Sequence, residues 1–597
     1  MSNKYQVSET TESAPPTQNK PCKMGWKVFG LVTSILFLVI ALSITAITLS
    51  GLSGKSDAAP TPPTVDTPYG RYVGVPDISN FTGQNFVTYR SIPFAKPPVG
   101  TLRFQRPQPL ERHESTQILN SITFKVSCLT ETKLNFAPSA YGEDCLYLNI
   151  YAPEVKDPAL KYPVMVWLHG GGFVAGSTFP DPIKLMSRGN VIVVTVNYRL
   201  SVFGFLTTMD NSLPSNNGIW DQYMALSWVK ENIQYFNGDN GSITLFGQSA
   251  GAISTGLHCF SPISSKLFHK AILQSGSVTS IITRNAKQRA LELGAKVGCS
   301  QAQGQAFADC LRQVSASTLL NNSIPSVYNI SLAQRQSDFL WQPVVDGQII
   351  PYEPLTMLKN LTYLREINFT GKDYLLGTQY NEGGLIPENF LNPVKLVELS
   401  KVEFFKDLVT YLLYARYGIK DSDYPRLRDA VYTFYTGSSS PATPLNSQFV
   451  QDLAGDVMFV VPAIETALAL TRSLNQTSVT SPDSAQPKVY MYKFDYCPNP
   501  QEATRFPCMT HGSEFSFQFP KAPFSDVTQE KLSNTFIDLL TTFARSSNPE
   551  TVVPSGWPLF EPGDQLYLSL DENPARRRYP YDYRLKFWLD TVPSLLN

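Results

Sequence analysis

The feature that most constrains the fold is a set of short, mostly apolar runs that do not alternate with polar residues. They are VMVWLH at 164–169, VIVVTVNY at 191–198, ITLF at 243–246, KAILQ at 270–274, YLLG at 374–377 and VYMYKF at 489–494. A strand with one face in water alternates in polarity, whereas a strand buried on both faces is apolar throughout. The runs therefore predict a mostly parallel central sheet flanked by helices.

Two segments between or after these runs have the apolar spacing of helices. In 221–236, Met224, Trp228 and Ile233 fall near one face, and 528–546 repeats apolar residues behind Thr528, the expected cap. Strands that alternate with helices are typical of the α/β class. With 597 residues, of which 43% are hydrophobic, the chain can bury a large core.

A charge-free segment lies near the N-terminus, where residues 28–54 read VFGLVTSILFLVIALSITAITLSGLSG. About 20 apolar residues suffice to cross a bilayer. Lys20, Lys23 and Lys27 precede the segment, and positive flanks stay in the cytoplasm. We therefore expect a signal-anchor helix at 28–52 in a single-pass type II membrane protein. The alternative is a cleaved signal peptide, which normally has a shorter apolar core.

The anchor separates regions of different composition. Residues 1–27 are polar and predict a cytoplasmic tail, and residues 53–68 are rich in proline and predict an extended stalk. Residues 69–597 are expected to form one domain on the extracellular or lumenal side. Lys plus Arg and Asp plus Glu number 49 each, so there is no basic excess that would favour nucleic-acid binding.

Asn-x-Ser/Thr sites agree with a glycosylating compartment on that side of the membrane. The sites expected to carry glycans are Asn80, Asn321, Asn329, Asn360, Asn368 and Asn475. Asn240 also fits the pattern, but it lies just before a strand and is the least favoured.

Six of the eight cysteines can close three local loops, as in proteins of an oxidising compartment. The candidate pairs are Cys128–Cys145, Cys299–Cys310 and Cys497–Cys508. Spacing alone does not fix the connectivity. Cys22 falls on the cytoplasmic side, and Cys259 is left over in an apolar stretch, where a buried and inert thiol is expected.

The sharpest motif is Gly247-Gln248-Ser249-Ala250-Gly251, the G-x-S-x-G nucleophile elbow. An apolar strand precedes it, and AGAISTGLHCF follows as a candidate helix. In such a strand-turn-helix, the flanking glycines remove side chains that would collide at the turn, and the serine oxygen stands clear. The context therefore favours a nucleophile over an ordinary glycine-rich turn.

A second motif, LHGGGF at 168–173, directly follows the VMVW strand. Successive glycines let backbone N–H groups approach the oxyanion of a tetrahedral intermediate, each worth on the order of 3 kcal/mol. A flexible turn is the simpler explanation of the glycines. Their place ahead of a nucleophile elbow favours an oxyanion loop.

Together these residues resemble a type-B carboxylesterase, the family that includes cholinesterases, in an order that covers roughly residues 67–597. The segments that carry the resemblance are EDCLYLNIY at 143–151, WLHGGGF at 167–173, FNGDNGSITLFGQSAGA at 236–252, LQSGS at 273–277, PVVDG at 343–347 and FWLDTVPSLL at 587–596. The resemblance implies an α/β-hydrolase fold.

The resemblance also implies the other members of a catalytic triad around Ser249. The family's acid lies in a Gly-x-x-x-x-Glu-Gly segment, here Gly377 to Gly383, which gives Glu382. Its base precedes Gly and, two residues later, Glu, which gives His511 in His511-Gly-Ser-Glu. His169 belongs to the oxyanion loop, and the remaining histidines have no motif around them and are expected to be structural.

Further roles follow from the same resemblance. The backbone N–H groups of Gly171, Gly172 and Ala250 correspond to the oxyanion donors, and Ser275 corresponds to a residue that supports the catalytic acid. The Cys128–Cys145 and Cys299–Cys310 loops match family disulfides, whereas Cys497–Cys508 has no reliable counterpart. The implied reaction is two-step acyl transfer from a small-molecule ester, and it requires no metal or cofactor.

The chain departs from the family at positions that read the substrate. Gln248 stands where most active relatives have Glu, which removes a negative charge beside the nucleophile. No tryptophan lies between Cys128 and Cys145, where cholinesterases place a choline-binding ring. Asn135, with Phe136 beside it, stands where the family places that tryptophan, and Leu385 stands where it places an aromatic residue three positions after the acid. In the acyl pocket, Phe339 is retained and Ser337 replaces a bulky residue. Together they favour a neutral ester over acetylcholine.

Two alternatives stay open beside a membrane-anchored carboxylesterase of broad specificity. The first is an adhesion or receptor protein, because some membrane-anchored members of the family keep the fold but have lost catalysis. The second is a narrower, true cholinesterase. Adhesion members usually lack a triad residue, whereas Ser249, Glu382 and His511 are all present here. The enzyme is therefore the favoured interpretation.

Overall fold

The computed structural model describes residues 62–596 except for 113–117, 131–139, 156, 179–180, 281–282, 301–302, 324–340, 368, 385–401, 420–424, 438–446, 476–486, 499–507 and 580–581. The chain divides into two units, 1–61 and 62–597, and the described residues all belong to the second. The predicted cytoplasmic tail, the 28–52 anchor and most of the stalk therefore lie outside the described residues.

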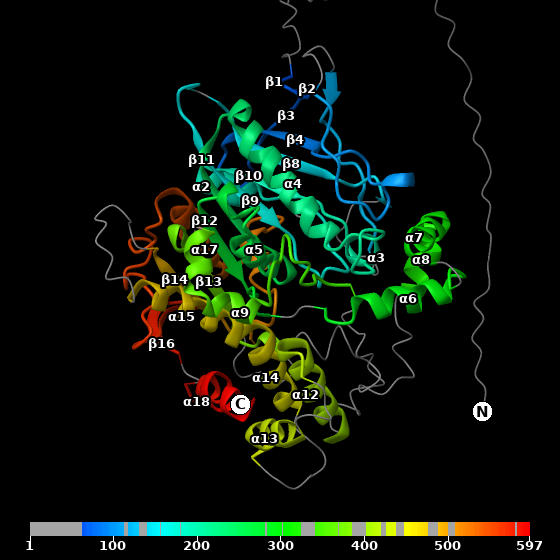
Figure 1. Cartoon of the computed structure of the whole chain (residues 1–597). Coiled ribbons are helices and arrows are strands. Elements are labelled where there is room, and N and C mark those ends of the chain that lie inside the picture. Colours follow the sequence, from blue (N-terminus) through cyan, green and yellow to red (C-terminus); the bar gives the residue numbers. More distant parts are fainter. Residues whose placement is uncertain are drawn as a thin grey trace, which may run out of the picture. The chain divides into compact units, whose positions relative to one another are not determined.

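An 11-stranded sheet forms the centre of the second unit (Figure 1). In spatial order its strands are β16 (Ala575–Arg578), β15 (Leu566–Leu570), β14 (Val489–Phe494), β13 (Asp373–Gln379), β12 (Lys270–Gln274), β11 (Gly238–Gln248), β9 (Tyr162–Leu168), β10 (Ile192–Val196), β8 (Tyr147–Pro153), β4 (Asn85–Pro93) and β3 (Val75–Ile78). From β15 to β10 each strand is parallel to its neighbours. Antiparallel pairing adds β16 at one edge and β8, β4 and β3 at the other. The six apolar runs correspond to the parallel strands β9 to β14, as predicted.

The absence of alternation in these strands reflects two separate cores, one on each face of the sheet. Along β9, Val164, Val166 and Leu168 belong to one hydrophobic cluster, whereas Met165 and Trp167 belong to the other. Successive side chains of a strand point to opposite faces, so both sets must be apolar. Helices cover both faces, with α4 (Asn217–Asn232) and α5 (Ala250–Phe260) contributing to the first cluster and α2 (Ile183–Gly189) and α17 (Val527–Ser546) to the second.

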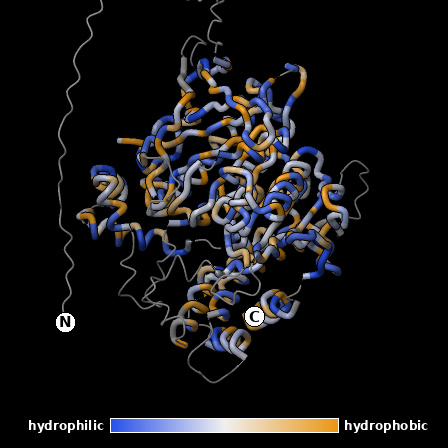
Figure 2. Tube along the Cα trace, turned by 180° about the vertical axis from the view of Figure 1, so that it is seen from behind, coloured by the Kyte–Doolittle hydropathy of each residue, from blue (hydrophilic) through white to orange (hydrophobic). Residues whose placement is uncertain are grey.

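Hydrophobic and hydrophilic stretches alternate along much of the trace (Figure 2). Some of the described α-helices lie against the sheet and others lie below it in the view of Figure 1. The described α-helices are α2 (Ile183–Gly189), α3 (Ser201–Phe205), α4 (Asn217–Asn232), α5 (Ala250–Phe260), α6 (Ala286–Lys296), α7 (Gly304–Gln313), α8 (Ala316–Ser323), α9 (Pro354–Lys359), α10 (Leu361–Glu366), α12 (Val402–Tyr417), α13 (Pro425–Thr436), α14 (Ser447–Gly455), α15 (Val461–Asn475), α16 (Phe515–Gln518), α17 (Val527–Ser546), α18 (Asp582–Lys586) and α19 (Val592–Leu596).

Both predicted helices are present, with corrections at their ends. The helix expected at 221–236 begins earlier, as α4, and its last turn is the 3₁₀ segment η3 (Ile233–Phe236). The helix expected at 528–546 is α17, but Thr528 does not cap it. The Asp526 carboxylate accepts a hydrogen bond of 2.8 Å from Gln529 N, because an aspartate at this position satisfies a free N–H of the first turn.

The predicted stalk ends earlier than expected. Thr64–Thr67 form β1, which pairs with β2 (Gly70–Val73) in a small sheet completed by β5 (Ile118–Asn120). The β-branched residues of β1 favour a strand, and Gly70, at φ 126°, allows the tight return. The prolines of this segment flank the strand, since Pro63 precedes β1 and Pro68 follows it, so the Pro-rich composition of 53–68 hid the four strand residues between them.

One described helix passes a length and composition test for a membrane span, but it is a different segment from the predicted anchor. The continuous helical stretch Gln448–Arg472 contains an 18-residue window with a mean hydropathy of 1.7, and 78% of that window is buried inside the domain. This burial is typical of a core helix. The stretch comprises most of α14, the π-helical turn η8 (Asp456–Val460) and most of α15.

All three candidate disulfides are formed, with Cα–Cα distances of 5.0 Å for Cys128–Cys145, 5.9 Å for Cys299–Cys310 and 4.1 Å for Cys497–Cys508. Cys259 is buried and unpaired, and burial raises the pKa of its thiol to about 12, as an inert thiol requires.

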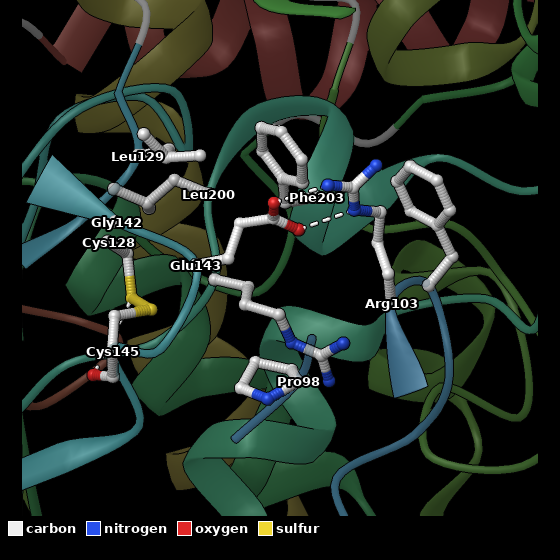
Figure 3. A pocket seen from close by; sticks show the side chains of 11 residues that line it. Pro98, Arg103, Cys128, Leu129, Gly142, Glu143, Cys145, Leu200 and Phe203 are labelled. Atoms are coloured by element: carbon white, nitrogen blue, oxygen red, sulfur yellow. Dashed lines mark hydrogen bonds and ion pairs between the residues drawn. A yellow bond between two sulfur atoms is a disulfide. The ribbon is translucent and has the colours of Figure 1, made fainter. Parts of the chain in front are cut away.

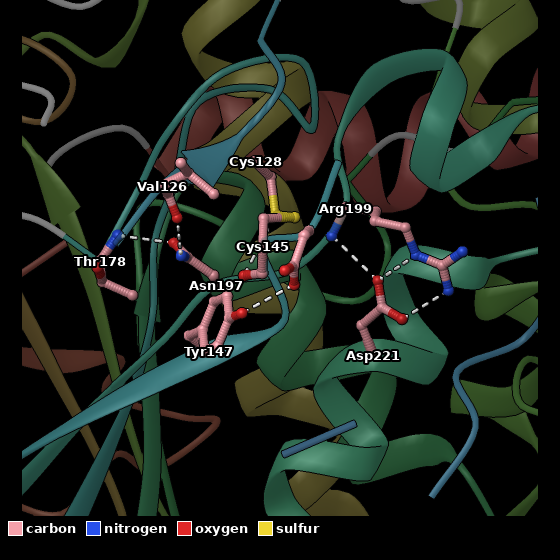
Figure 4. The surroundings of a disulfide bond; sticks show 9 residues. Val126, Cys128, Cys145, Tyr147, Thr178, Asn197, Arg199 and Asp221 are labelled. Atoms are coloured by element: carbon pink, nitrogen blue, oxygen red, sulfur yellow. Dashed lines mark hydrogen bonds and ion pairs between the residues drawn. A yellow bond between two sulfur atoms is a disulfide. The ribbon is translucent and has the colours of Figure 1, made fainter. Parts of the chain in front are cut away.

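Two ion pairs lie near the first disulfide. Beside Cys128–Cys145, Arg103 makes a two-point contact with Glu143 across a small pocket (Figure 3). Arg199, which lines the same pocket, binds Asp221 through two nitrogens at 2.7 and 2.6 Å (Figure 4). Both charges of the second pair are almost fully enclosed, with 3% and 0% of the side chains exposed.

Three predicted glycosylation sites lie on described surface. Asn80, Asn321 and Asn360 are exposed, although the Asn360 side chain accepts a hydrogen bond from Tyr363 N at the start of α10. Asn240 is half-buried in β11, and its amide donates to Lys230 O. The side chains of Asn329, Asn368 and Asn475 lie outside the described residues.

Candidate active site

Ser249 lies in the turn between β11 and α5, with φ 56° and ψ −123°. A positive φ at a non-glycine residue costs on the order of 1–3 kcal/mol, so the surrounding packing must impose it. The flanking glycines show how. A Cβ at Gly251 would lie 1.9 Å from the carbonyl oxygen of Leu168, and one at Gly247 would lie 2.8 Å from the same oxygen. The end of β9 thus passes too close to the turn for a side chain at either glycine position. Ser249 itself stays half-exposed.

His511 and Glu382 form a hydrogen-bonded pair beside this turn. The ring nitrogen Nδ1 of His511 is 2.7 Å from Glu382 Oε2, and 5% and 1% of the two side chains are exposed. The other carboxylate oxygen, Oε1, accepts a hydrogen bond of 2.8 Å from Gln379 N at the end of β13. Phe459 covers one face of the imidazole, with ring centroids 4.1 Å apart. The ring is therefore fixed in position and oriented by an acceptor at Nδ1.

A local pairing brings these two residues together from positions 129 apart in sequence. Asn381, the residue before Glu382, forms a β-bridge with Thr510, the residue before His511. The short 3₁₀ segment η6 (Glu382–Gly384) then turns against α14, where a Cβ at Gly383 would lie 1.8 Å from Gln451 O. The glycine after the acid thus permits a close approach that any other residue would block.

The nucleophile elbow meets the histidine through the side chain of Gln248. Gln248 Nε2 lies 3.3 Å from His511 Nε2, the ring nitrogen opposite Glu382. No hydrogen bond joins Ser249 to His511 in this structure. The structure thus brings His511 and Glu382 into direct contact, and it links the elbow to them by the neighbour of the nucleophile.

The glycine loop after β9 lies directly against the elbow. A Cβ at Gly170 would be 3.1 Å from the Cβ of Ser249, and Gly171 and Gly172 have φ values of 110° and 63°. No described residue accepts a hydrogen bond from the backbone N–H of Gly171, Gly172 or Ala250. These donors are the kind that an oxyanion would take up.

His169 anchors this loop as a neutral ring. It stacks on Tyr198 with centroids 4.3 Å apart, and its Nδ1 is 2.9 Å from Gly170 O. Burial lowers the pKa of His169 to about 4, so the ring is uncharged at neutral pH. His258 and His269 also have structural contacts, to Gln222 and to Ile243 N respectively, and His113 lies outside the described residues.

Ser275 is fully buried at the end of β12, with φ 54°. Gln379 Nε2 is 3.5 Å from its hydroxyl oxygen, and Gln379 N in turn donates to Glu382. Its connection to the acid therefore runs through Gln379 and is not a direct contact.

Glu514 is a second buried carboxyl that the sequence treated only as part of the histidine motif. It is 0% exposed, and no described group hydrogen-bonds to either of its oxygens. Burial, and then repulsion by Glu382, raise the pKa of Glu514 to about 8. The carboxyl is therefore protonated at neutral pH. In the sequence, only its position three residues after His511 could have indicated that it lies near the site.

Glu382 also borders a polar cavity of about 580 Å³ whose described lining contains neither Ser249 nor His511. Arg584 and Lys493 lie in its wall, and Arg584 is paired with Asp452 and Asp456. The described residues contain no group of three His, Cys, Asp or Glu side chains that could hold a metal ion. The positions predicted to distinguish substrates, Asn135, Phe136, Ser337, Phe339 and Leu385, lie outside the described residues.

Comparison with known proteins identifies the family. The profile of the Carboxylesterase family matches residues 61–588. The chain belongs to this family. It is 32% identical to the liver carboxylesterase of Sus scrofa, over 89% of this chain and 93% of that protein. It is 34% identical to carboxylesterase 5A of Mus musculus, over 85% and 86%. A fatty acyl-CoA hydrolase precursor, medium chain, of Anas platyrhynchos is 30% identical over 94% and 97%.

Membership of the carboxylesterase family makes the chain a carboxylic ester hydrolase with an α/β-hydrolase fold, as the motifs predicted. The mixed sheet, parallel in its centre and flanked by helices on both faces, is the architecture that this fold requires.

Proposed function

We propose that this carboxylesterase acts through a Ser249–His511–Glu382 triad and a covalent acyl-enzyme. The supporting observation is the buried His511–Glu382 pair beside a serine in a positive-φ elbow. His511 Nε2 takes the proton of Ser249 as its oxygen attacks the ester carbonyl, and returns it to the departing alcohol. Water then attacks the acyl-enzyme by the same route in reverse. Glu382 keeps the proton of the neutral ring on Nδ1 and stabilises the imidazolium.

The oxyanion of each tetrahedral intermediate is assigned to the N–H groups of Gly171, Gly172 and Ala250. Their lack of other acceptors among the described residues supports this role, because donors that need no rearrangement stabilise charge best. Gln248 contributes no charge beside the nucleophile. We therefore propose neutral carboxylic esters as substrates, in preference to choline esters.

The catalytic domain is further proposed to be held at a membrane by a type II anchor at 28–52, with the domain in the lumen or outside the cell. The uncharged segment behind Lys20, Lys23 and Lys27 supports the anchor. Three disulfides support an oxidising compartment for the domain.

One experiment tests the chemistry and the anchor together. The full chain, its Ser249→Ala variant and a Ser516→Ala control are expressed, and membranes are washed with alkaline carbonate. Ser516 is exposed on α16, close to His511 in sequence, and should be dispensable. We expect hydrolysis of a short neutral ester, with labelling by an organophosphate, to remain in the washed membranes and to be lost only in Ser249→Ala.

Each alternative interpretation has its own outcome in that experiment. A folded wild type that neither hydrolyses esters nor takes the label would refute the triad and favour an adhesion protein. Faster turnover of a choline ester than of the neutral ester would instead indicate a cholinesterase. Activity that leaves the membranes in carbonate would refute the anchor alone.

A further inference from the structure

The side chain of Gln248 occupies a slot between the oxyanion loop and the loop that carries His511. Only 9% of the residue is exposed. A Cβ at Gly170 would lie 2.8 Å from Gln248 Oε1, and a Cβ at Gly512 would lie 3.4 Å from its Nε2. Two glycines therefore leave the room that this amide fills, and its reach toward His511 is set by its surroundings.

The contact between the amide and the imidazole has a defined donor and acceptor. His511 Nδ1 faces the Glu382 carboxylate at 2.7 Å, and an ionised carboxylate only accepts, so the proton of the neutral ring is on Nδ1. Nε2 then carries a lone pair. Gln248 Nε2, at 3.3 Å, is an NH₂ group that donates to it. This is the same lone pair that must receive the proton of Ser249.

The remaining groups packed against the ring do not compete for Nε2. On the elements that contact it, the charged or titratable side chains are Glu382 on η6, Glu514 in its own loop, Asp456 at the start of η8 and Asp239 on β11. Asp239 lies at the opposite end of β11 from Gln248. Glu382 is bound at Nδ1. Glu514 is protonated at neutral pH, and Asp456 is paired with Arg584 and Tyr435. The Nε2 side of the ring thus faces a neutral amide.

We propose that Gln248 is a positioning residue that orients the neutral ring of His511 and favours its neutral form by donating its amide N–H to Nε2. The inference deepens the proposed function and rests on the Ser249–His511–Glu382 triad. A hydrogen bond to the neutral form of a base favours that form, so the amide extends activity toward acid pH. When Nε2 takes the Ser249 proton, the amide N–H loses its acceptor and must turn away from the new Nε2–H.

The test is the acid limb of the pH profile of kcat/KM for a neutral ester, measured between pH 5 and 9 on the full chain. Gln248→Met keeps the length of the side chain and removes the donor. We expect its midpoint to move to higher pH by up to about one unit, the size of a single hydrogen bond. Gln248→Glu replaces the donor with a charged acceptor that favours the imidazolium, and its midpoint should move further in the same direction.

If Gln248 had a purely structural role, both substitutions would lower kcat/KM, but the midpoints would not rise in the order wild type, Gln248→Met, Gln248→Glu. An unchanged midpoint in Gln248→Met would overturn the inference. A midpoint that moves to lower pH would also overturn it, because it would show that the amide oxygen faces the imidazolium. The rate of organophosphate labelling against pH gives the same limb without turnover and counts the folded sites. If the wild type shows neither labelling nor turnover, the triad itself is refuted, and the role of Gln248 with it.

Discussion

Glu514 makes the stability of the domain depend on pH with a sign opposite to that of most carboxylates. Its pKa is raised from 4.5 to about 8, first by burial and then by the charge of Glu382. The folded state therefore holds a proton that the unfolded state releases. The contribution to stability is fully present below about pH 4.5 and is lost as the pH rises through about 8.

The magnitude follows from the shift. Each pKa unit corresponds to about 1.4 kcal/mol, so the fully buried carboxyl withdraws on the order of 5 kcal/mol of folding free energy across that window. Glu514→Gln has nearly the same shape as the protonated acid and cannot ionise. We expect the variant to unfold at nearly the same denaturant concentration as the wild type at pH 5, and to be clearly more stable at pH 8.

Denaturant midpoints of both proteins at pH 5, 6.5 and 8 measure this difference, and Glu530→Gln is the matched control. Burial tends to raise the pKa of Glu530, but its bonds to Lys184, at 2.7 Å, and to Phe524 N, at 3.0 Å, outweigh this and lower it. Its contribution is present above the ordinary pKa and lost toward acid, so the control should be destabilised at pH 8. A Glu514→Gln midpoint that differs from wild type by the same amount at every pH would refute the reasoning.

Two further predictions test the packing around the site. Gly251→Ala should abolish ester turnover and organophosphate labelling, because its Cβ would lie 1.9 Å from Leu168 O, whereas Gly563→Ala, with nothing within 4 Å, should leave both unchanged. Asp221→Asn should lower the free energy of unfolding by about 3–5 kcal/mol, because it leaves the buried Arg199 guanidinium without a counter-charge. The exposed Asp66→Asn, which breaks the Arg71 pair, should have no measurable effect on the denaturant midpoint.

The sequence was most informative where a short run of residues is compatible with only one structural environment. Runs such as VMVWLH identified the parallel strands, because burial on both faces leaves no other composition open to them. The antiparallel strands β3, β4 and β8 were not predicted. Their composition is more mixed, and β4 shifts register between Tyr89 and Ile92, which breaks any simple period. The cap of α17 was misplaced by two residues because Asp526 and Thr528 both have capping side chains.

The site divides in the same way. The elbow and the glycine loop are each continuous in sequence, so the amino-acid pattern by itself indicates that their glycines permit close backbone approach. Glu382 could be chosen only through the family resemblance, because the β-bridge that sets it beside His511 joins positions far apart in the chain. The contact of Gln248 with His511 spans 263 positions and has no local pattern at all. The sequence showed a missing charge at Gln248, and only the fold shows that the amide in its place touches His511.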